Sequence, residues 1–453
     1  MSERLANEAA VERALDELRR HPGIGGELFL RDSISGSVEV KDGAIENVLD
    51  HGERGIWVRV LDGERAGFAY TSDLAAHGID ACVDTARAMA GVTEPDPDLA
   101  LTDAADLDAA DLAIHEAGAA DRPVAERAAV ALEAERAARE VDPRITGLRK
   151  TSFSAGETTT IFATTSGARG TYVESFYGLG TSAIASEGDE RQTAGHSEGA
   201  RTFNGVSGAS VGKRAAELAV GKLGSRSFPT QRIAVVLDPW MGMQLLGAVG
   251  ALFNADSVLK GKSLFADRIG QRVASDGVTI VDDARRRGGI RSAPFDGEGT
   301  PTTTRALVQG GVLRGYLTSI KTARKLGTEP TGNARRGSYA TPSRIAPSNL
   351  HIAAGSADAS EMVRGLDRAL KITALLNLHT IDPISGEFSL GAAADYLERG
   401  AKQYPVQGIT IAGNLLELLA SIAGVGNDLV FGGSGLGSPT LVIPELSVGG
   451  SER

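Results

Sequence analysis

The chain has 453 residues and a formal net charge of −11, because 58 acidic residues outnumber 47 lysines and arginines. A net-acidic surface repels nucleic-acid phosphates, and the densest basic clusters, at 285–287 and 335–336, are short, so nucleic-acid binding is disfavoured. A hydrophobic fraction of 42% with 23% charged residues is typical of a globular protein with a sizeable core. This composition excludes disorder as the main state.

The cysteine content and the N-terminus limit the cellular context. The single cysteine, Cys82, excludes intrachain disulfides and multi-cysteine metal sites, and its helical surroundings predict a buried apolar side chain rather than a nucleophile. The charged N-terminal segment lacks the apolar core of a signal peptide, and nowhere do 18 uncharged apolar residues follow one another. We therefore expect a soluble, cytoplasmic protein that makes no membrane contact.

The first half of the chain predicts helices combined with antiparallel strands. An apolar stripe predicts a helix over residues 2–20. Short alternating segments then predict a meander of strands with turns at 42–43 and 62–63. Asp73 is expected to cap the next helix, which would run to about residue 90. Further along, an alanine-rich helix reaches about residue 141, and Ser/Thr/Gly-rich strands lie between 150 and 203.

A Gly/Ser/Pro-containing segment at 224–229 predicts the boundary between two domains, 1–225 and 226–453. After it, the apolar run 233–237 predicts a buried strand, and Asp238 followed by Pro239 predicts the start of a helix. That helix is apolar nearly all round, so we expect it deep inside the domain. Another helix is expected from Ser360 to about Ala369, followed by a glycine-rich sheet region.

The predicted fold class is therefore α+β. The N-terminal domain is expected to be a meandering antiparallel sheet with helices. The C-terminal domain is expected to be rich in β-structure around one buried helix.

None of the usual catalytic patterns assembles along the chain. The seven histidines are scattered, and His115-Glu116 lacks the second histidine that a zinc-peptidase helix needs. Gly261-Lys262-Ser263 resembles the end of a P-loop but lacks its earlier glycine. The glycines at 432–437 neither precede a helix nor complete a serine-hydrolase elbow. The residues themselves therefore predict no metal site and no catalytic set.

Several short motifs nevertheless occur in a fixed order, more clearly in the second half of the chain than in the first. They include Thr331-Gly332-Asn333-Ala334, Asp382-Pro383-Ile384-Ser385-Gly386-Glu387-Phe388-Ser389, Gln403-Tyr404-Pro405-Val406, Ile409-Thr410-Ile411-Ala412-Gly413-Asn414-Leu415 and Val425-Gly426-Asn427-Asp428. Together they resemble the TldD/PmbA family over nearly the whole chain.

That resemblance implies one of two kinds of subunit. TldD-like chains carry a His-Glu-x-x-x-His zinc-peptidase motif on a C-terminal helix and a later cysteine ligand, whereas PmbA-like (TldE-like) partners lack the motif and pair with them. In this chain the corresponding positions are Leu246, Gly247 and Ala251, and no such motif occurs anywhere. These residues offer no lone pair for zinc and no base for a bound water.

The resemblance also suggests where a peptide would bind. Arg335, Arg336 and Tyr339 follow the motif at 331–334 and resemble a loop near the family's peptide-binding cleft. A structural role as solvated or interface residues is the alternative for each of them.

The expected function is that of a non-catalytic PmbA/TldE-like subunit of a heterodimeric zinc metallopeptidase. The chain itself would hold no cofactor, and the zinc would sit in a TldD-like partner. Its role would be to shape a chamber for proteolysis or maturation of unstructured, extended peptides. Two alternatives remain open at this level: a stand-alone, metal-independent biosynthetic enzyme, and a homodimeric peptide-binding or regulatory protein.

Overall fold

The computed structural model describes residues 2–103, 107 and 110–451, and its fold is α+β. The N-terminal half is built around one six-stranded antiparallel sheet in the order β3-β2-β1-β4-β5-β6. Its elements are α1 (Ser2–Arg19), β1 (Ile24–Lys41), β2 (Ala44–Asp62), β3 (Arg65–Thr71), α2 (Ala76–Val92), α3 (Val124–Val141), β4 (Ile145–Thr164), β5 (Arg169–Glu187), β6 (Glu190–Ala200), the 3-10 turn η1 (Phe203–Gly205) and α4 (Gly208–Val220).

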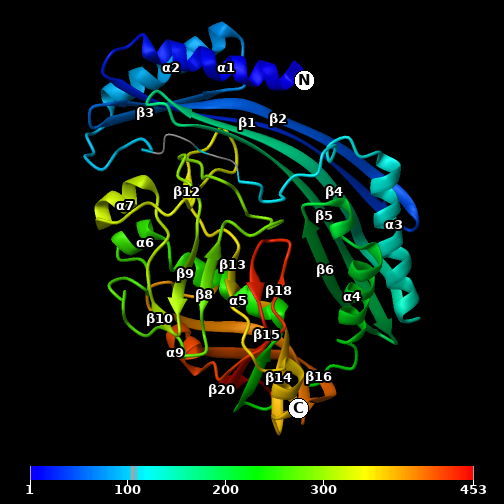
Figure 1. The fold of residues 1–453 in the computed structure, drawn as a ribbon. Coiled ribbons are helices and arrows are strands. Elements are labelled where there is room, and N and C mark those ends of the chain that lie inside the picture. The colour runs from blue at the N-terminus through cyan, green and yellow to red at the C-terminus, as the bar shows by residue number, and fades with distance from the viewer. Residues whose placement is uncertain (1, 104–106, 108–109, 452–453) are drawn as a thin grey trace.

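The strands of this sheet are long and curved, so the short strands expected from the sequence merge. The two predicted strands around 28–40, for example, form the single strand β1, which pairs with β2 along its whole length. Figure 1 shows the sheet arching over the C-terminal half, with the four helices on its outer side. Helices α1 and α2 pack on one end of that outer face through Leu15, Leu18 and Val83, and α3 packs farther along.

The C-terminal half contains a closed five-stranded barrel and a second sheet. The barrel strands follow the order β16-β15-β14-β7-β20, and pairing of β16 with β20 closes the ring. The second sheet has the order β10-β9-β8-β13-β19-β18. The elements are β7 (Gln231–Leu237), α5 (Pro239–Ala251), α6 (Ala255–Leu259), β8 (Ile280–Asp283), β9 (Thr304–Gln309), β10 (Val312–Leu313), α7 (Ile320–Leu326), β11 (Ala334–Arg335), β12 (Arg344–Ile345), β13 (Leu350–Ile352), α8 (Ala359–Arg364), β14 (Arg368–Leu376), the 3-10 turn η2 (Leu378–Thr380), β15 (Glu387–Glu398), β16 (Ala401–Asn414), α9 (Leu415–Ser421), β17 (Gly424–Val425), β18 (Val430–Phe431), β19 (Gly437–Ser438) and β20 (Leu441–Gly449).

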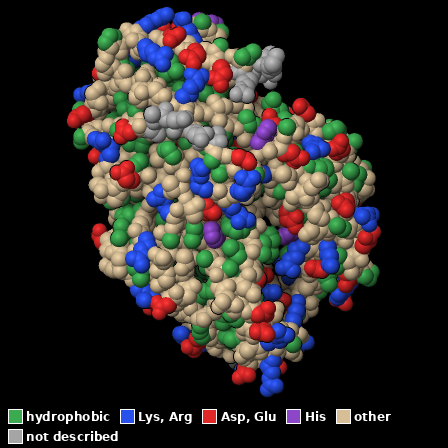
Figure 2. All heavy atoms as spheres, viewed as in Figure 1, with side chains coloured by type: hydrophobic (Ala, Val, Ile, Leu, Met, Phe, Trp, Pro, Cys, Tyr) green, Lys and Arg blue, Asp and Glu red, His purple; other side chains and the backbone are tan. Residues whose placement is uncertain are grey.

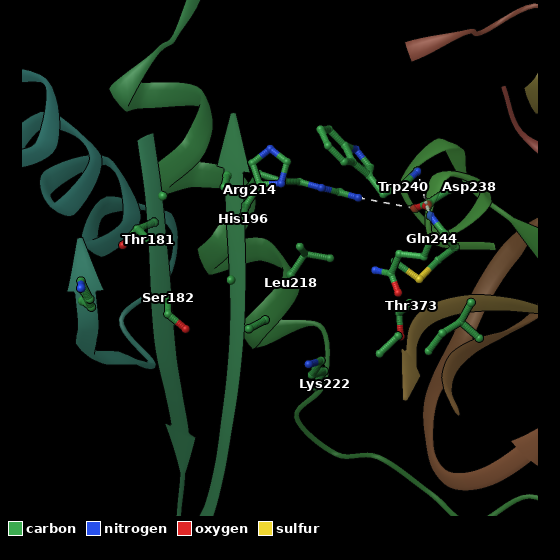
Figure 3. A pocket seen from close by; sticks show the side chains of 18 of the residues that line it. Thr181, Ser182, His196, Arg214, Leu218, Lys222, Asp238, Trp240, Gln244 and Thr373 are labelled. Carbon is green, nitrogen blue, oxygen red and sulfur yellow. Dashed lines mark hydrogen bonds and ion pairs between the residues drawn. The ribbon is translucent and has the colours of Figure 1, made fainter. Parts of the chain in front are cut away.

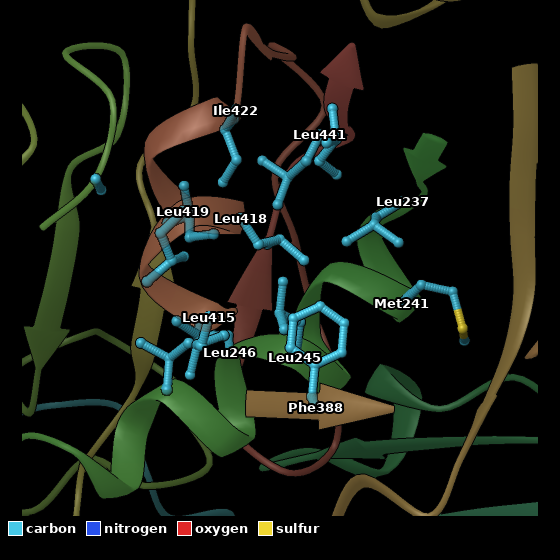
Figure 4. Packing of buried hydrophobic residues seen from close by; sticks show 14 of the residues in the cluster. Leu237, Met241, Leu245, Leu246, Phe388, Leu415, Leu418, Leu419, Ile422 and Leu441 are labelled. Carbon is cyan, nitrogen blue, oxygen red and sulfur yellow. The ribbon is translucent and has the colours of Figure 1, made fainter. Parts of the chain in front are cut away.

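Helix α5 lies at the centre of the C-terminal core. Its Leu245 and Leu246 pack with Phe388 of β15 and with leucines of α9, as Figure 4 shows. Contacts to both sheets make α5 the element around which this half is assembled. The expected buried helix in a β-rich region is therefore present.

Two local expectations were wrong. Asp73 does not cap α2: the N-cap is Ala75, and the Asp73 carboxylate instead accepts a hydrogen bond from the Ala75 backbone N–H at 3.0 Å. The helix expected over 360–369 ends at Arg364, because Gly365 is its C-cap and β14 begins at Arg368. Pairing of β14 with β7 and β15 outweighs the local helical pattern.

The surface carries interspersed charges of both signs, as Figure 2 shows for one face. Over the described part of the chain, every helix is too short or too polar to span a bilayer.

Candidate functional site

Helix α5 starts as the sequence predicts. The Asp238 carboxylate accepts hydrogen bonds from the backbone N–H groups of Trp240 and Met241, both at 3.1 Å, and Pro239 occupies the first turn. The side chain thus satisfies two of the backbone donors that a helix start leaves free. The cap fixes α5 directly after the buried strand β7.

The three positions that the family resemblance sets against the zinc motif, Leu246, Gly247 and Ala251, do not share one face of α5. Leu246 is 1% exposed and belongs to the hydrophobic core, whereas Gly247 and Ala251 are exposed. A Cβ atom placed on Gly247 would have one neighbour, the Leu436 side chain at 3.5 Å. The three positions themselves therefore offer neither an imidazole nor a carboxylate, and only Leu246 lies in apolar surroundings.

The described residues contain no group of three or more His, Cys, Asp or Glu side chains placed to hold a metal ion. Cys82 lies buried in α2, far from α5 in the fold, and burial raises the pKa of its thiol to about 11. A thiol of that pKa stays protonated at neutral pH and is a poor metal ligand.

Arg336, one of the predicted substrate contacts, is buried where the C-terminal half meets the N-terminal sheet. Its side chain is 1% exposed and forms an ion pair with Glu27 of β1 at 3.3 Å. The guanidinium lies 3.6 Å from the centre of the Trp57 ring and donates to the Gly297 carbonyl at 2.9 Å. Burial lowers the pKa of Arg336 to about 10.

Glu27, the partner of Arg336, is held by a second arginine. Arg59 of β2 donates to its other carboxylate oxygen at 2.5 Å. Burial raises the pKa of the Glu27 carboxyl, and the two guanidinium groups oppose that shift. The surroundings of Arg336 thus favour the structural alternative, and a peptide contact at this residue stays a prediction.

Arg335 and Tyr339 lie at the same junction but are less buried than Arg336. Arg335 donates to the Arg291 carbonyl at 2.6 Å and to Ser348 at 2.5 Å. The Tyr339 ring covers Gly55 of β2 and meets Tyr70 edge-on, with ring centres 6.1 Å apart. The structure therefore brings all three predicted residues together, along the line where the two halves touch.

A cleft that the sequence did not predict lies between the two halves, next to the start of α5. It has a volume of about 610 Å³ and is lined by β5, β6 and α4 on one wall and by the start of α5 and by β14 on the other. Figure 3 shows Arg214 reaching from α4 across this cleft toward Asp238, with Trp240 and His196 beside it. The Arg214 and Asp238 side chains form an ion pair at 3.6 Å.

Three family models match successive parts of the chain. They are described as PmbA/TldA metallopeptidase domain 1, over residues 26–90, central domain, over 118–223, and C-terminal domain, over 230–450. The chain belongs to the PmbA/TldD family. The first two models divide residues that the structure joins in one sheet, since β1–β3 fall mainly in the first and β4–β6 in the second.

Relatives within the family carry both subunit names. The chain is 29% identical to the metalloprotease PmbA of Escherichia coli O157:H7, over 98% of this chain and 96% of that protein. It is 28% identical to a metalloprotease TldD homologue of Haemophilus influenzae, over 94% of this chain and 92% of that protein.

Solved structures of the same fold cover nearly the whole chain. A Thermotoga maritima MSB8 protein, described as a putative modulator of a DNA gyrase, superposes with a TM-score of 0.89 at 27% identity, over 97% of this chain and 99% of that one. TldE of Thermococcus kodakarensis superposes with a TM-score of 0.87 at 17% identity, over 98% and 100%, which shows the fold alone.

The PmbA/TldD fold explains why sequence reasoning missed the cleft. Its walls come from residues as far apart as Lys150 and Leu375, and no local pattern links them. The one readable signal was Asp238, which the sequence identified as a helix cap and not as part of a cleft.

Proposed function

We propose that this chain is the non-catalytic, PmbA/TldE-like subunit of a heterodimeric TldD/TldE-type zinc metallopeptidase. The observation that carries the proposal is the occupancy of α5. By the family resemblance, Leu246, Gly247 and Ala251 take the places of the motif's ligands and base, and Leu246 is packed into the core. Hydrocarbon side chains neither coordinate zinc nor take a proton from water.

Zinc does not fit the residues that the structure describes, so we assign the metal, the nucleophilic water and the general base to a TldD-like partner. The role left to this chain is to bound a shared chamber and admit only extended peptides. Two features support that role. The N-terminal sheet is concave toward the C-terminal half, as Figure 1 shows, and β6 is an edge strand along which an extended peptide can add.

The test is a cleavage assay on an unstructured peptide with four samples: this chain, the TldD-like chain, their mixture, and the mixture with a chelator. We expect cleavage in the mixture and its loss with chelator, because zinc would be supplied by the partner. A TldD-like chain with its motif glutamate replaced by glutamine is the matched control, and its mixture should be inactive.

Two results would contradict the proposal. Cleavage by this chain alone that survives chelation would indicate a stand-alone, metal-independent enzyme. A homodimer that does not associate with the TldD-like chain on mixing would indicate a peptide-binding or regulatory protein.

A further inference from the structure

Three adjoining hollows meet at the Arg214–Asp238 ion pair. The cleft of about 610 Å³ continues into hollows of about 110 Å³ and about 600 Å³, and both residues line all three. The pair therefore stands at the centre of a continuous cleft between the two halves. Ligand sites occur preferentially in such clefts between packed units.

The largest hollow is basic although the chain is acidic. Its lining includes three basic side chains, Lys150, Arg214 and Lys222, and one carboxylate, that of Asp238. The second hollow adds Lys371, which pairs with Asp238, and Lys402, which pairs with Asp395, and its lining also includes Glu217. The excess of basic groups therefore lies in the first hollow, beside Arg214, and on a chain of net charge −11 it favours a small anion there.

Arg214 is the basic group best placed for a ligand. Its Nη2 atom lies 3.6 Å from Asp238 Oδ2, which is an ion-pair distance longer than a hydrogen bond. The other Asp238 oxygen is engaged by the start of α5. A guanidinium has five donors in a planar fork, so Arg214 keeps donors for an incoming carboxylate.

Lys222 provides a second donor. Its Nζ atom donates to the Thr193 carbonyl at 2.9 Å, and desolvation by burial lowers the pKa of this lysine. An anion beside the lysine would offset the desolvation of its charge. Lys150, by contrast, is already paired with Glu39 of β1.

An apolar and aromatic surface adjoins these charges. The Trp240 ring meets His196 edge-on with centres 4.6 Å apart, and Leu218, Met241 and Leu375 line the same hollow. Gln244 also lines it and lies on the exposed side of α5 with Gly247 and Ala251, at spacings of three and four residues. The cleft thus leads onto the helix face that carries two of the replaced motif positions.

We propose that this cleft binds the C-terminal carboxylate of an extended peptide, with Arg214 receiving the carboxylate and the Trp240 surface receiving the last side chain. The proposal rests on the proposed function, in which peptides enter between the subunits. A single negative charge suits the site better than a phosphate dianion, because Asp238 stands next to Arg214 and repels a second charge. An Arg–carboxylate pair can form two parallel hydrogen bonds.

The test measures binding to the full chain alone by fluorescence anisotropy. The probes are an unstructured decapeptide labelled at its N-terminus, with a free C-terminal carboxylate, and the same peptide as its C-terminal amide. We expect the free acid to bind at least about tenfold more tightly than the amide. Arg214→Gln should remove that preference, so that the free acid and the amide bind the variant equally well.

Arg232→Gln is the matched control, since Arg232 is an exposed arginine paired with Glu445 and does not line the three hollows. It should keep the full preference for the free acid. Thermal unfolding followed by circular dichroism checks that each variant is folded. If Arg214→Gln does not fold, Arg214→Lys takes its place in the binding assay. The lysine variant should retain only part of the preference, because it lacks the planar fork.

Equal binding of acid and amide, absence of binding, or a preference that survives Arg214→Gln would each overturn the proposal. So would displacement of the peptide by inorganic phosphate at a lower concentration than by acetate, which would point to a phosphorylated ligand. These readouts need no partner and no cleavage. The two proposals are therefore tested separately: the mixing assay can contradict the proposed function, and the anisotropy assay can contradict this binding site.

Discussion

Leu246 and Ala251 stand five residues apart on α5 yet lie in opposite environments. Leu246 is part of the hydrophobic core, and Ala251 is exposed at the end of the helix. The family resemblance suggested both as replaced motif positions, but the sequence gave no sign of this difference in burial. Burial depends on what packs against each face, and α9 and β15, which cover Leu246, come more than a hundred residues later.

This difference predicts opposite responses to substitution. Leu246→Ala should lower the free energy of unfolding by about 2–5 kcal/mol, because it leaves a cavity in a packed core. Ala251→Trp should change it by less than about 0.5 kcal/mol, as surface substitutions usually do. Urea unfolding monitored by circular dichroism measures both. Cleavage by the mixture with a TldD-like chain should be unchanged by Ala251→Trp, and its loss would show that this face still serves the complex.

Asp296 predicts a dependence of stability on pH. Its carboxylate is buried, and desolvation together with the neighbouring Glu298 raises its pKa to about 7, although three backbone N–H groups hydrogen-bond to it at 2.8–3.0 Å. An acid whose pKa is raised in the folded state binds its proton more tightly there than in the unfolded chain. Its contribution to stability is present below the unfolded pKa of about 4 and is lost as pH rises toward 7.

Asp296→Asn removes this titration, so the variant isolates it from other groups. The stability of the wild type relative to Asp296→Asn should fall as pH rises from 5 to 7, by up to roughly 1.4 kcal/mol per unit of pKa shift. Urea unfolding of both proteins at pH 5, 6 and 7 measures the difference. A constant difference across this range would contradict the shift.

At the scale of elements, the sequence was most informative where a local interaction fixes the end of a helix. Asp238 and Pro239 begin α5 as predicted, because a side-chain cap and a proline act within one turn. The prediction that a helix runs past Gly365 was wrong, because the pairing of β14 with β7 that replaces it is a long-range interaction. The long strands of the N-terminal sheet were likewise seen only as fragments.

The contact between β3 and α2 predicts contrasting effects of two glycines. A Cβ atom on Gly67 would lie 2.1 Å from the Ala86 carbonyl oxygen and 2.2 Å from the Ala90 nitrogen, both backbone atoms. Gly67→Ala should therefore lower the free energy of unfolding by about 1–3 kcal/mol, because the helix must move away.

Gly91 is the matched control on the same helix. A Cβ atom there would meet nothing within 4 Å, and alanine favours the helical backbone over glycine. Gly91→Ala should raise the free energy of unfolding by up to about 1 kcal/mol. Urea unfolding of the two variants gives both values. If the two substitutions change the free energy of unfolding in the same direction, the close packing of α2 on β3 is contradicted.

At the scale of the whole molecule, the two halves are joined through charges that their sequences do not reveal as partners. Glu27 and Arg336 are 309 residues apart, and only the fold places them together. The sequence suggested Arg336 from its place after a family motif, which located the loop but not its surroundings. The cleft at Arg214 was unreadable for the same reason, since its walls meet only in the folded chain.

The Glu27–Arg336 pair predicts a coupled loss of stability. Arg336→Leu should lower the free energy of unfolding by about 3 kcal/mol, near the lower end for breaking a buried pair, because Arg59 still pairs with Glu27. Glu27→Gln combined with Arg336→Leu should lower it by less than the sum of the two single variants, since residues in one network are not independent.

The same variants separate the two roles considered for Arg336. If the residue joins the two halves, the single variant loses stability, the double variant recovers part of it, and the KM of the mixture for peptide stays the same under conditions where the variant is folded. If Arg336 contacts peptide instead, stability should change by less than about 0.5 kcal/mol while KM rises. The ion pair to Glu27 and the Trp57 ring stacked 3.6 Å from the guanidinium favour the first outcome.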